Sequence, residues 1–221
     1  MISILFVLVI SLLVDVRIVF DHNPNDTANR EFKFKNIASP MKDDAASTAK
    51  LTLIDGELDQ GSAELSALTD GRLPSDEDEP GANVFFRAAS SGGRFRMDFN
   101  TPIDIAQVNS YSWHPNTRGP QLYKLYAADG SEPKLKLDPK RGVDPASVGW
   151  KFIALVSTLS QEGEGGGQYA ASVSDTSGSL GKYRYLLFDC YITEYNDNWG
   201  NTFYSEIDVI GKKWLAADFR G

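Results

Sequence analysis

The chain contains very little cysteine and histidine and has no surplus of positive charge. Its 221 residues include one cysteine, Cys190, and two histidines, His22 and His114. A single cysteine excludes an internal disulfide and a multi-cysteine metal cluster, and two histidines leave little room for a His-rich zinc site. With 22 Lys and Arg against 30 Asp and Glu, the net charge is −8. This argues against duplex nucleic acid as a partner, because phosphates need a basic surface.

Several catalytic motifs are also missing. The sequence has no Gly-x-Ser-x-Gly elbow and no His-Glu-x-x-His pair. The glycine-rich stretch 163–167, GEGGG, lacks the Gly-Lys-Ser/Thr ending of a phosphate loop. A glycosidase needs only two carboxylates, but nothing singles out a pair among the many acids. We therefore predict a protein that is not an enzyme, and a hydrolase is only a third hypothesis.

The first residues have the composition of an export signal. Residues 1–14 carry no charge, and 14 residues fall short of the about 20 that span a bilayer as a helix. We expect residues 1–20 to be a signal peptide or an N-terminal apolar segment of an exported protein (periplasmic, cell-surface or secreted). No Lys or Arg precedes the run and no clear cleavage site follows it, so an uncleaved anchor and a buried β-strand are the alternatives.

The rest of the chain is predicted to be β-structure. Apolar residues alternate with polar ones over 95–99 and 123–127, the runs 152–156 and 183–192 have strand length, and 207–209 marks a last strand. Turn clusters rich in Gly, Pro and Asn separate them. We therefore expect an all-β sandwich or jelly roll. Residues 61–221 would form its main domain, with 21–60 as an N-terminal extension that joins it. Cys190 would be a buried apolar side chain in a central strand.

An acidic loop follows a tight turn at Asp70. Residues 76–79 are four consecutive acids, and oxygen-rich loops bind calcium because Ca²⁺ takes six to eight hard oxygen ligands. The spacing does not match an EF-hand, and a solvated acidic loop is the alternative.

Two further segments combine aromatic and polar side chains. One covers residues 110–126 and contains a loop that extends from Trp113 through His114 to Arg118. The other covers residues 193–208 and includes four candidate residues: Asn196, Trp199, Asn201 and Tyr204. An aromatic ring stacks on the apolar face of a sugar, while amides, imidazoles and guanidinium groups bind hydroxyls. The alternatives are a proline-stiffened hairpin whose Trp covers the core edge and a connection rich in Asx turns.

The order of these segments resembles the coagulation-factor type C (discoidin-like) family of the galactose-binding-like superfamily. The resemblance covers roughly residues 60–211 and rests on five segments: LTDG at 68–71, FRMDF at 95–99, the strand 105–113, the strand 122–127 and SEIDV at 205–209. More closely, the chain is similar to the version found in exported proteins of planctomycete-type bacteria. The cysteine pair that joins the domain ends in animal members is absent here.

The resemblance implies a jelly-roll β-sandwich that binds ligands through loops at one end, usually without catalysis. It also implies a structural Ca²⁺ held by Asp70 and Glu206, with the carbonyl of Leu68 and the side chains of Asp76 or Asp78 as further ligands. In a sugar site, His114 and Arg118 would bind hydroxyls, Asn196 and Asn201 would supply amides, and Trp113 or Trp199 would be the stacking face, with Tyr204 nearby.

The leading hypothesis is thus an exported, non-catalytic carbohydrate-binding module whose partner is a glycan or polysaccharide. The alternative is a protein-interaction or cell-surface adhesion module that uses the same loops without sugar. The acidic balance makes a membrane lipid an unfavourable partner, because lipid-binding relatives display basic residues and exposed apolar side chains.

Overall fold

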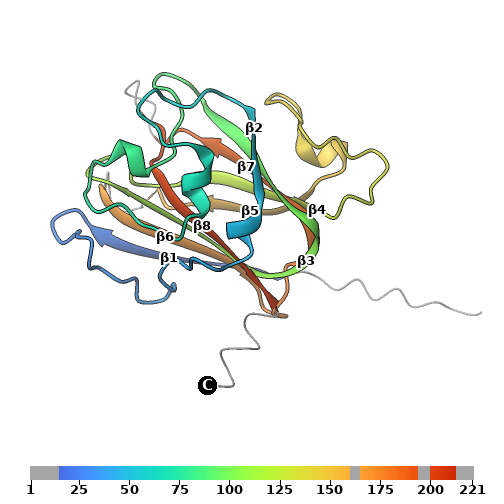
Figure 1. Ribbon diagram of the computed structural model, residues 1–221, viewed down its shortest axis with the longest axis horizontal. Coiled ribbons are helices and arrows are strands. Elements are labelled where there is room, and N and C mark those ends of the chain that lie inside the picture. The colour runs from blue at the N-terminus through green and yellow to red at the C-terminus, as the bar shows by residue number, and fades with distance from the viewer. Residues whose placement is uncertain (1–14, 160–164, 194–199, 213–221) are drawn as a thin grey trace, which may run out of the picture.

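The computed structural model describes residues 15–159, 165–193 and 200–212, which fold into two packed antiparallel β-layers (Figure 1). The all-β fold class predicted from the sequence is confirmed. There are eight strands in the described residues: β1 (Val16–Pro24), β2 (Lys50–Asp55), β3 (Gly92–His114), β4 (Leu122–Ala128), β5 (Lys151–Ser157), β6 (Gly167–Asp175), β7 (Gly181–Tyr191) and β8 (Tyr204–Gly211). Four short 3₁₀ helices lie between strands: η1 (Ala46–Thr48), η2 (Leu65–Thr69), η3 (Pro80–Ala82) and η4 (Pro145–Val148).

Strand β3 belongs to both layers. Its first part pairs with β2 and β7, for example Phe95 with Phe188. Its last part pairs with β6 and β8, for example Val108 with Val173 and Val209. One layer is therefore β2–β3–β7–β4–β5, and the other is β1–β6–β3–β8. The pairing with β7 shifts between Asp98 and Ile103, where β3 passes from one layer to the other.

The core lies between the layers. Buried apolar side chains come from both, including Phe95 and Phe188, whose rings stack with centroids 4.9 Å apart, and Ile207 of β8. Cys190 is buried among them in β7, as predicted, and burial raises the pKa of its thiol. A buried thiol of this kind packs as a small apolar side chain and is not a nucleophile.

The N-terminal segments add strands to both layers. Strand β1 pairs with β6 over its whole length, from Val16 with Asp175 to Pro24 with Gly167, and β2 pairs with β3. The expected boundary at residue 20 therefore falls inside a strand, and the extension 21–60 contributes β2 to the sandwich. No helix among the described residues is long and apolar enough to cross a membrane.

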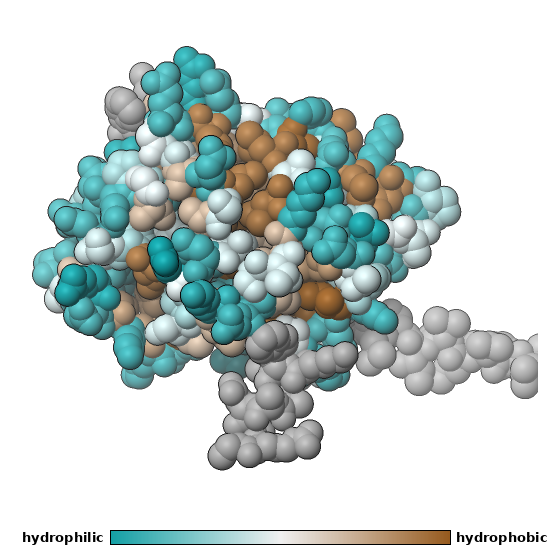
Figure 2. All heavy atoms as spheres, viewed as in Figure 1, coloured by the Kyte–Doolittle hydropathy of each residue, from teal (hydrophilic) through white to brown (hydrophobic). Residues whose placement is uncertain are grey.

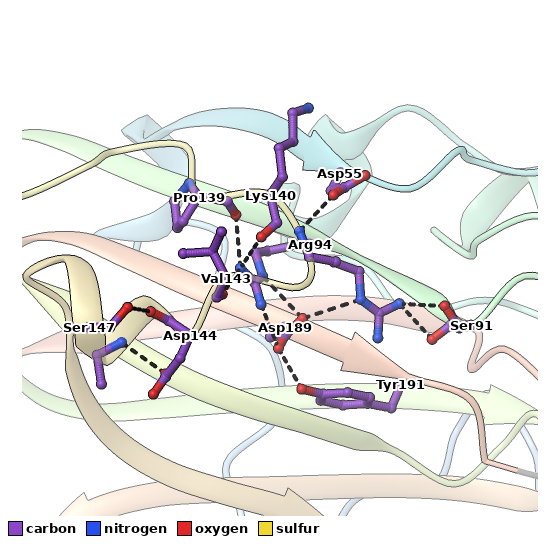
Figure 3. A network of polar contacts seen from close by, with 12 residues as sticks. Asp55, Ser91, Arg94, Pro139, Lys140, Val143, Asp144, Ser147, Asp189 and Tyr191 are labelled. Atoms are coloured by element: carbon purple, nitrogen blue, oxygen red, sulfur yellow. Dashed lines mark hydrogen bonds and ion pairs between the residues drawn. The ribbon is translucent and has the colours of Figure 1, made fainter.

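A buried ion pair joins β3 and β7 and fixes the segment that covers them. Arg94 and Asp189 are opposite each other in register, with Nη2 and Oδ2 2.9 Å apart and side chains only 4% and 3% exposed. Arg94 Nη1 also donates to the carbonyl oxygens of Pro139 and Val143 at 2.8 and 3.1 Å (Figure 3). A single guanidinium thus satisfies a buried carboxylate and ties residues 129–149 to the sheet.

Removing one partner of this pair leaves the other charge buried without compensation. We therefore expect Arg94→Met to lower the free energy of unfolding by about 3 to 5 kcal/mol, measured by urea denaturation. The matched control is Arg87→Met, because Arg87 forms an exposed pair with Glu57 and should cost less than about 1 kcal/mol. An equal loss of unfolding free energy in the two variants would show that the buried Arg94–Asp189 pair does not have this stabilising role.

Candidate functional site

Four strands have ends at one edge of the sandwich. His114 ends β3 opposite Gly167, which begins β6, and Ser112 pairs with Tyr204 at the start of β8. In the other layer Tyr123 of β4 pairs with Cys190, next to the last residue of β7. This register brings the loops 115–121 and 200–203 together, and residue 193 bonds to both through the hydroxyl of Thr193, which donates to the carbonyls of Thr117 and Gly200.

His114 is the central polar group of this end. Its side chain is buried, its Nδ1 accepts the backbone N–H of Asn116 at 3.2 Å, and its ring packs edge-on against Phe203. A neutral ring that accepts at Nδ1 carries its proton on Nε2. That Nε2 has no hydrogen-bond partner among the described residues. Burial, and then the charge of Arg118, lower the pKa of His114 to about 4, so the ring is neutral at pH 7.

Two charged groups flank the imidazole. Asp78 Oδ1 lies 3.9 Å from His114 Nε2, and its side chain is 60% exposed. The half-buried Arg118 places its guanidinium over the ring of Phe203, with Cζ 4.7 Å from the centroid. A carboxylate, an imidazole N–H and a guanidinium thus gather at one end of the sandwich. Asp78 and Arg118 can present an acceptor and donors to a polyhydroxylated ligand, whereas His114 is only 1% exposed.

Trp113 does not share this face, which corrects the expectation that it converges with His114. Successive side chains of a strand point to opposite faces. Trp113 instead lines a small cavity of about 10 Å³ with Phe34, Leu73 and Gln168 on the outer side of its layer. The side chain is only 4% exposed, so the indole is covered and not presented as a stacking face. Its Nε1 lacks a hydrogen-bond partner in the described part of the chain.

Asn201 and Tyr204 have structural contacts. Asn201 is buried, and its amide donates to the carbonyl of Arg87 at 3.1 Å, which joins two loops. Tyr204 lies in the core beside Cys190 and Tyr123, and burial raises its pKa well above 10. Neither side chain faces solvent, so neither can contact a ligand directly. Their role in binding would be to position the loops that they hold. Asn196 and Trp199 lie outside the described residues.

Sequence reasoning missed Gln121 and Phe203. The buried Gln121 accepts the hydroxyl of Ser110 at 2.5 Å and donates to Ser112 Oγ at 3.1 Å, which fixes the end of the 115–121 loop. Phe203 stacks on Phe85 with centroids 4.1 Å apart and supports both His114 and Arg118. Both residues stood inside the segments singled out above, but no local signal distinguishes a supporting side chain from a neighbour that binds.

The expected calcium ligands Asp70 and Glu206 belong to segments that do meet. Glu206 Oε2 accepts the backbone N–H groups of Gly71 and Arg72 at 2.8 and 3.3 Å. The Glu206 side chain is buried, and burial, together with nearby Asp208, raises its pKa to about 9. In the described part of the chain no positive charge near this carboxyl offsets the effect of burial, and a cation would supply one.

The other expected ligands are placed less favourably for a cation at that turn. Asp78 lies beside His114, and Asp76 accepts the N–H of Glu77 at 2.7 Å. Leu68 is buried in η2. Across residues 15–159, 165–193 and 200–212, no three His, Cys, Asp or Glu side chains form a metal-binding group. A Ca²⁺ here would therefore depend on backbone carbonyls for most of its ligands.

Comparisons with known proteins find only remote similarity, and it is similarity in fold. No protein-family model matches the chain, and no curated protein is similar to it in sequence. Among solved structures, a fucolectin from the serum of striped bass (Morone saxatilis) has a TM-score of 0.49 at 13% identity and covers 81% of this chain and 50% of that one.

Two further neighbours are described with their ligands. The module CpGH89CBM32-4 produced by Clostridium perfringens, in complex with GlcNAc-α-1,4-galactose, has a TM-score of 0.47 at 11% identity and covers 75% of this chain and 92% of its own. The lectin domain of lectinolysin, complexed with Lewis B antigen, has a TM-score of 0.47 at 12% identity and covers 76% and 96%. These ligands are those of the two neighbouring proteins.

The buried, neutral His114 makes stability depend on pH. The unfolded chain binds a proton near pH 6.5 that the folded chain does not accept until about pH 4, so stability falls as the pH drops through this range. We expect His114→Gln to reduce this acid-side loss by up to about 3 kcal/mol, measured by urea unfolding at pH 7, 5.5 and 4. Parallel pH curves for the variant and the wild type would contradict a neutral buried imidazole.

Proposed function

We propose that this protein is a non-catalytic carbohydrate-binding module that binds glycans through the loops at the His114 end of the sandwich. The observation that carries the proposal is the cluster of His114, Asp78 and Arg118, in which the imidazole Nε2, without a hydrogen-bond partner among the described residues, lies 3.9 Å from an exposed carboxylate. An unpaired buried donor costs free energy unless a ligand or water accepts from it. A sugar hydroxyl can be such an acceptor.

Each group has a distinct part in this proposal. Asp78 accepts hydroxyl protons, while Arg118 and His114 Nε2 donate to hydroxyl or ring oxygens. Phe203, which contacts both His114 and Arg118, holds the two donors in place. Trp199 stays the predicted stacking face and Asn196 a predicted amide ligand. Binding per site would be weak, since each contact replaces a well-solvated hydroxyl–water bond.

We also propose where the module acts and what its partner is. The uncharged run 1–14 supports export, and a glycan or polysaccharide outside the cell is the proposed partner. The similarity to the planctomycete-type version of the domain also stays a prediction. No reaction is proposed, because the cluster contains one carboxylate and a neutral imidazole without an activated nucleophile.

We also propose a structural Ca²⁺ at the turn that Asp70 and Glu206 share, with backbone carbonyls as the remaining ligands. When bound, such an ion supplies positive charge to carboxylates that burial otherwise keeps protonated. The raised pKa of Glu206 supports this proposal.

Glycan binding should depend on the charge of Asp78 in particular. We expect Asp78→Asn to weaken binding about tenfold or more, as a hydrogen bond to a charged group is lost. The measurement is calorimetric titration with galactose-type sugars and with plant and algal polysaccharides. Glu77→Gln is the control, because Glu77 is an exposed acid in the same loop. If no glycan binds the wild type, with or without Ca²⁺, the proposed function is wrong.

Calcium should stabilise the wild type through Glu206. We expect added Ca²⁺ to raise the Tm, an effect that should disappear in Glu206→Gln and in excess chelator. Gln reproduces the protonated carboxyl, so the variant should fold with a normal Tm at pH 7 without calcium. If Ca²⁺ does not change the Tm of the wild type, the calcium proposal is wrong, and the proposed glycan site is unaffected.

A further inference from the structure

The positive charges of this acidic protein are concentrated around β4 and the segment that covers it. Residues 122–151 contain six basic and four acidic side chains, whereas the rest of the chain has 16 basic and 26 acidic ones. Lys134, Lys136 and Lys140 of this segment are exposed. This stretch of a protein with net charge −8 is therefore locally basic, which favours an anionic partner there.

The residues 129–149 cover only part of the outer face of the β7–β4–β5 layer. Apolar side chains of the covering segment and of Trp150 pack on Tyr126, Tyr185 and Leu187. Beyond that cover the register places Lys124 of β4 between Asp189 of β7 and Leu155 of β5. Leu155 is 48% exposed.

A row of outward side chains crosses the three strands at this uncovered part. Their neighbours Cys190, Tyr123 and Val156 are buried in the core, so strand alternation directs Tyr191, Lys124 and Leu155 to the outside. We call these three residues, together with Arg141 from the covering segment, the β7–β4–β5 row.

Two cations of the row meet at Tyr191. Arg141 Cζ lies 5.0 Å and Lys124 Nζ 5.7 Å from the centroid of its ring. The hydroxyl of Tyr191 donates to Asp189 Oδ2 at 2.5 Å, so the ring lies beside the buried Arg94–Asp189 pair (Figure 3). The positions of the ring and of Arg141 are thus fixed by the fold, which lowers the entropic cost of binding.

Arg141 is already engaged within the fold: its Nη1 donates to the carbonyl oxygen of Ser91 at 2.6 Å, and its Nε lies 3.7 Å from Asp189 Oδ1 (Figure 3). Asp189 itself is held by Arg94, with Nη2 and Oδ2 2.9 Å apart. Asp55 accepts the backbone N–H of Arg141 at 2.6 Å, and Asp144 accepts the N–H of Ala146. Lys124 has no carboxylate within ion-pair distance in the described structure, and its charge is available to a ligand.

We propose that the β7–β4–β5 row binds an anionic polysaccharide, one that carries carboxylate or sulfate groups along an extended chain. Lys124 would bind the anionic groups, with Arg141 adding positive charge beside it, while Leu155 and the ring of Tyr191 contact the apolar faces of the sugars. A row across three strands suits an extended polymer. This surface is separate from the His114 end, so the inference goes beyond the proposed function.

The test compares polygalacturonate with its fully methyl-esterified form, using the full chain and affinity electrophoresis at two salt concentrations. We expect the acid form to bind, the ester to bind weakly, and added salt to weaken binding. Lys124→Gln should reduce affinity for polygalacturonate about fivefold, the equivalent of about 1 kcal/mol. Lys35→Gln is the matched control, because this exposed lysine follows Phe34, which packs on Tyr111 over the other layer.

Three results would overturn the inference: equal binding of ester and acid, equal loss in the two lysine variants, or no polygalacturonate binding while vesicles of phosphatidylserine sediment with the protein. Each variant is checked for an unchanged Tm. Asp78→Asn separates the two sites, because it should weaken neutral glycans at the His114 end and leave the difference between Lys124→Gln and wild type intact. Loss of neutral-glycan binding alone would count against the proposed function and not against this surface.

Discussion

The structure depends on β3, a single strand that must satisfy the backbone pairing of both layers. Its first part is fixed between β2 and β7 and its last part between β6 and β8. Because the strand ends at His114, the direction in which it leaves the second layer decides where the loop 115–121 begins. The position of the proposed glycan site is therefore a consequence of strand pairing, and the loop itself needs little stiffness of its own.

Charged groups buried in the fold are used in two different ways. Arg94 and Asp189 neutralise each other and hold a long covering segment through carbonyl contacts, which leaves Tyr191 and Arg141 in fixed positions. Among the described residues Glu206 and Asp208 have no cationic partner, and burial raises the pKa of Asp208 to about 7. The first arrangement stabilises a surface, whereas the second is the place where we propose that a cation binds. Figure 2 shows that hydrophilic side chains surround the apolar area over β2, where Leu53 is exposed.

The sequence predicted the strands whose alternation or apolar run is strong, and it missed those whose pattern is weak. Residues 95–99, 123–127 and 152–156 lie in β3, β4 and β5, because period-two burial is visible in a single segment. Strand β6 was missed, since its Gln168, Ala170 and Ser172 are small or polar although they are buried between two strands. Burial there is set by neighbours far away in the chain, and local composition does not record it.

The candidate site was predicted in composition but only partly in geometry. His114 and Arg118 meet as expected, because a short loop keeps them close. Trp113 is separated from them by the alternation of β3, a consequence of strand register that the loop composition hides. Asp78 was expected at a metal and lies beside His114, since the fold of the acidic loop depends on contacts within residues 75–83 that spacing does not reveal.

The central claim is that glycans bind at the His114 end. The most direct measurement is a titration of the isotope-labelled protein with a panel of neutral glycans, followed residue by residue by NMR. The account predicts concentration-dependent shifts at Asp78, His114 and Arg118, with the Nε2–H signal of His114 moving as it gains an acceptor. Shifts that are absent for every glycan, or that are confined to residues far from this end, would contradict it.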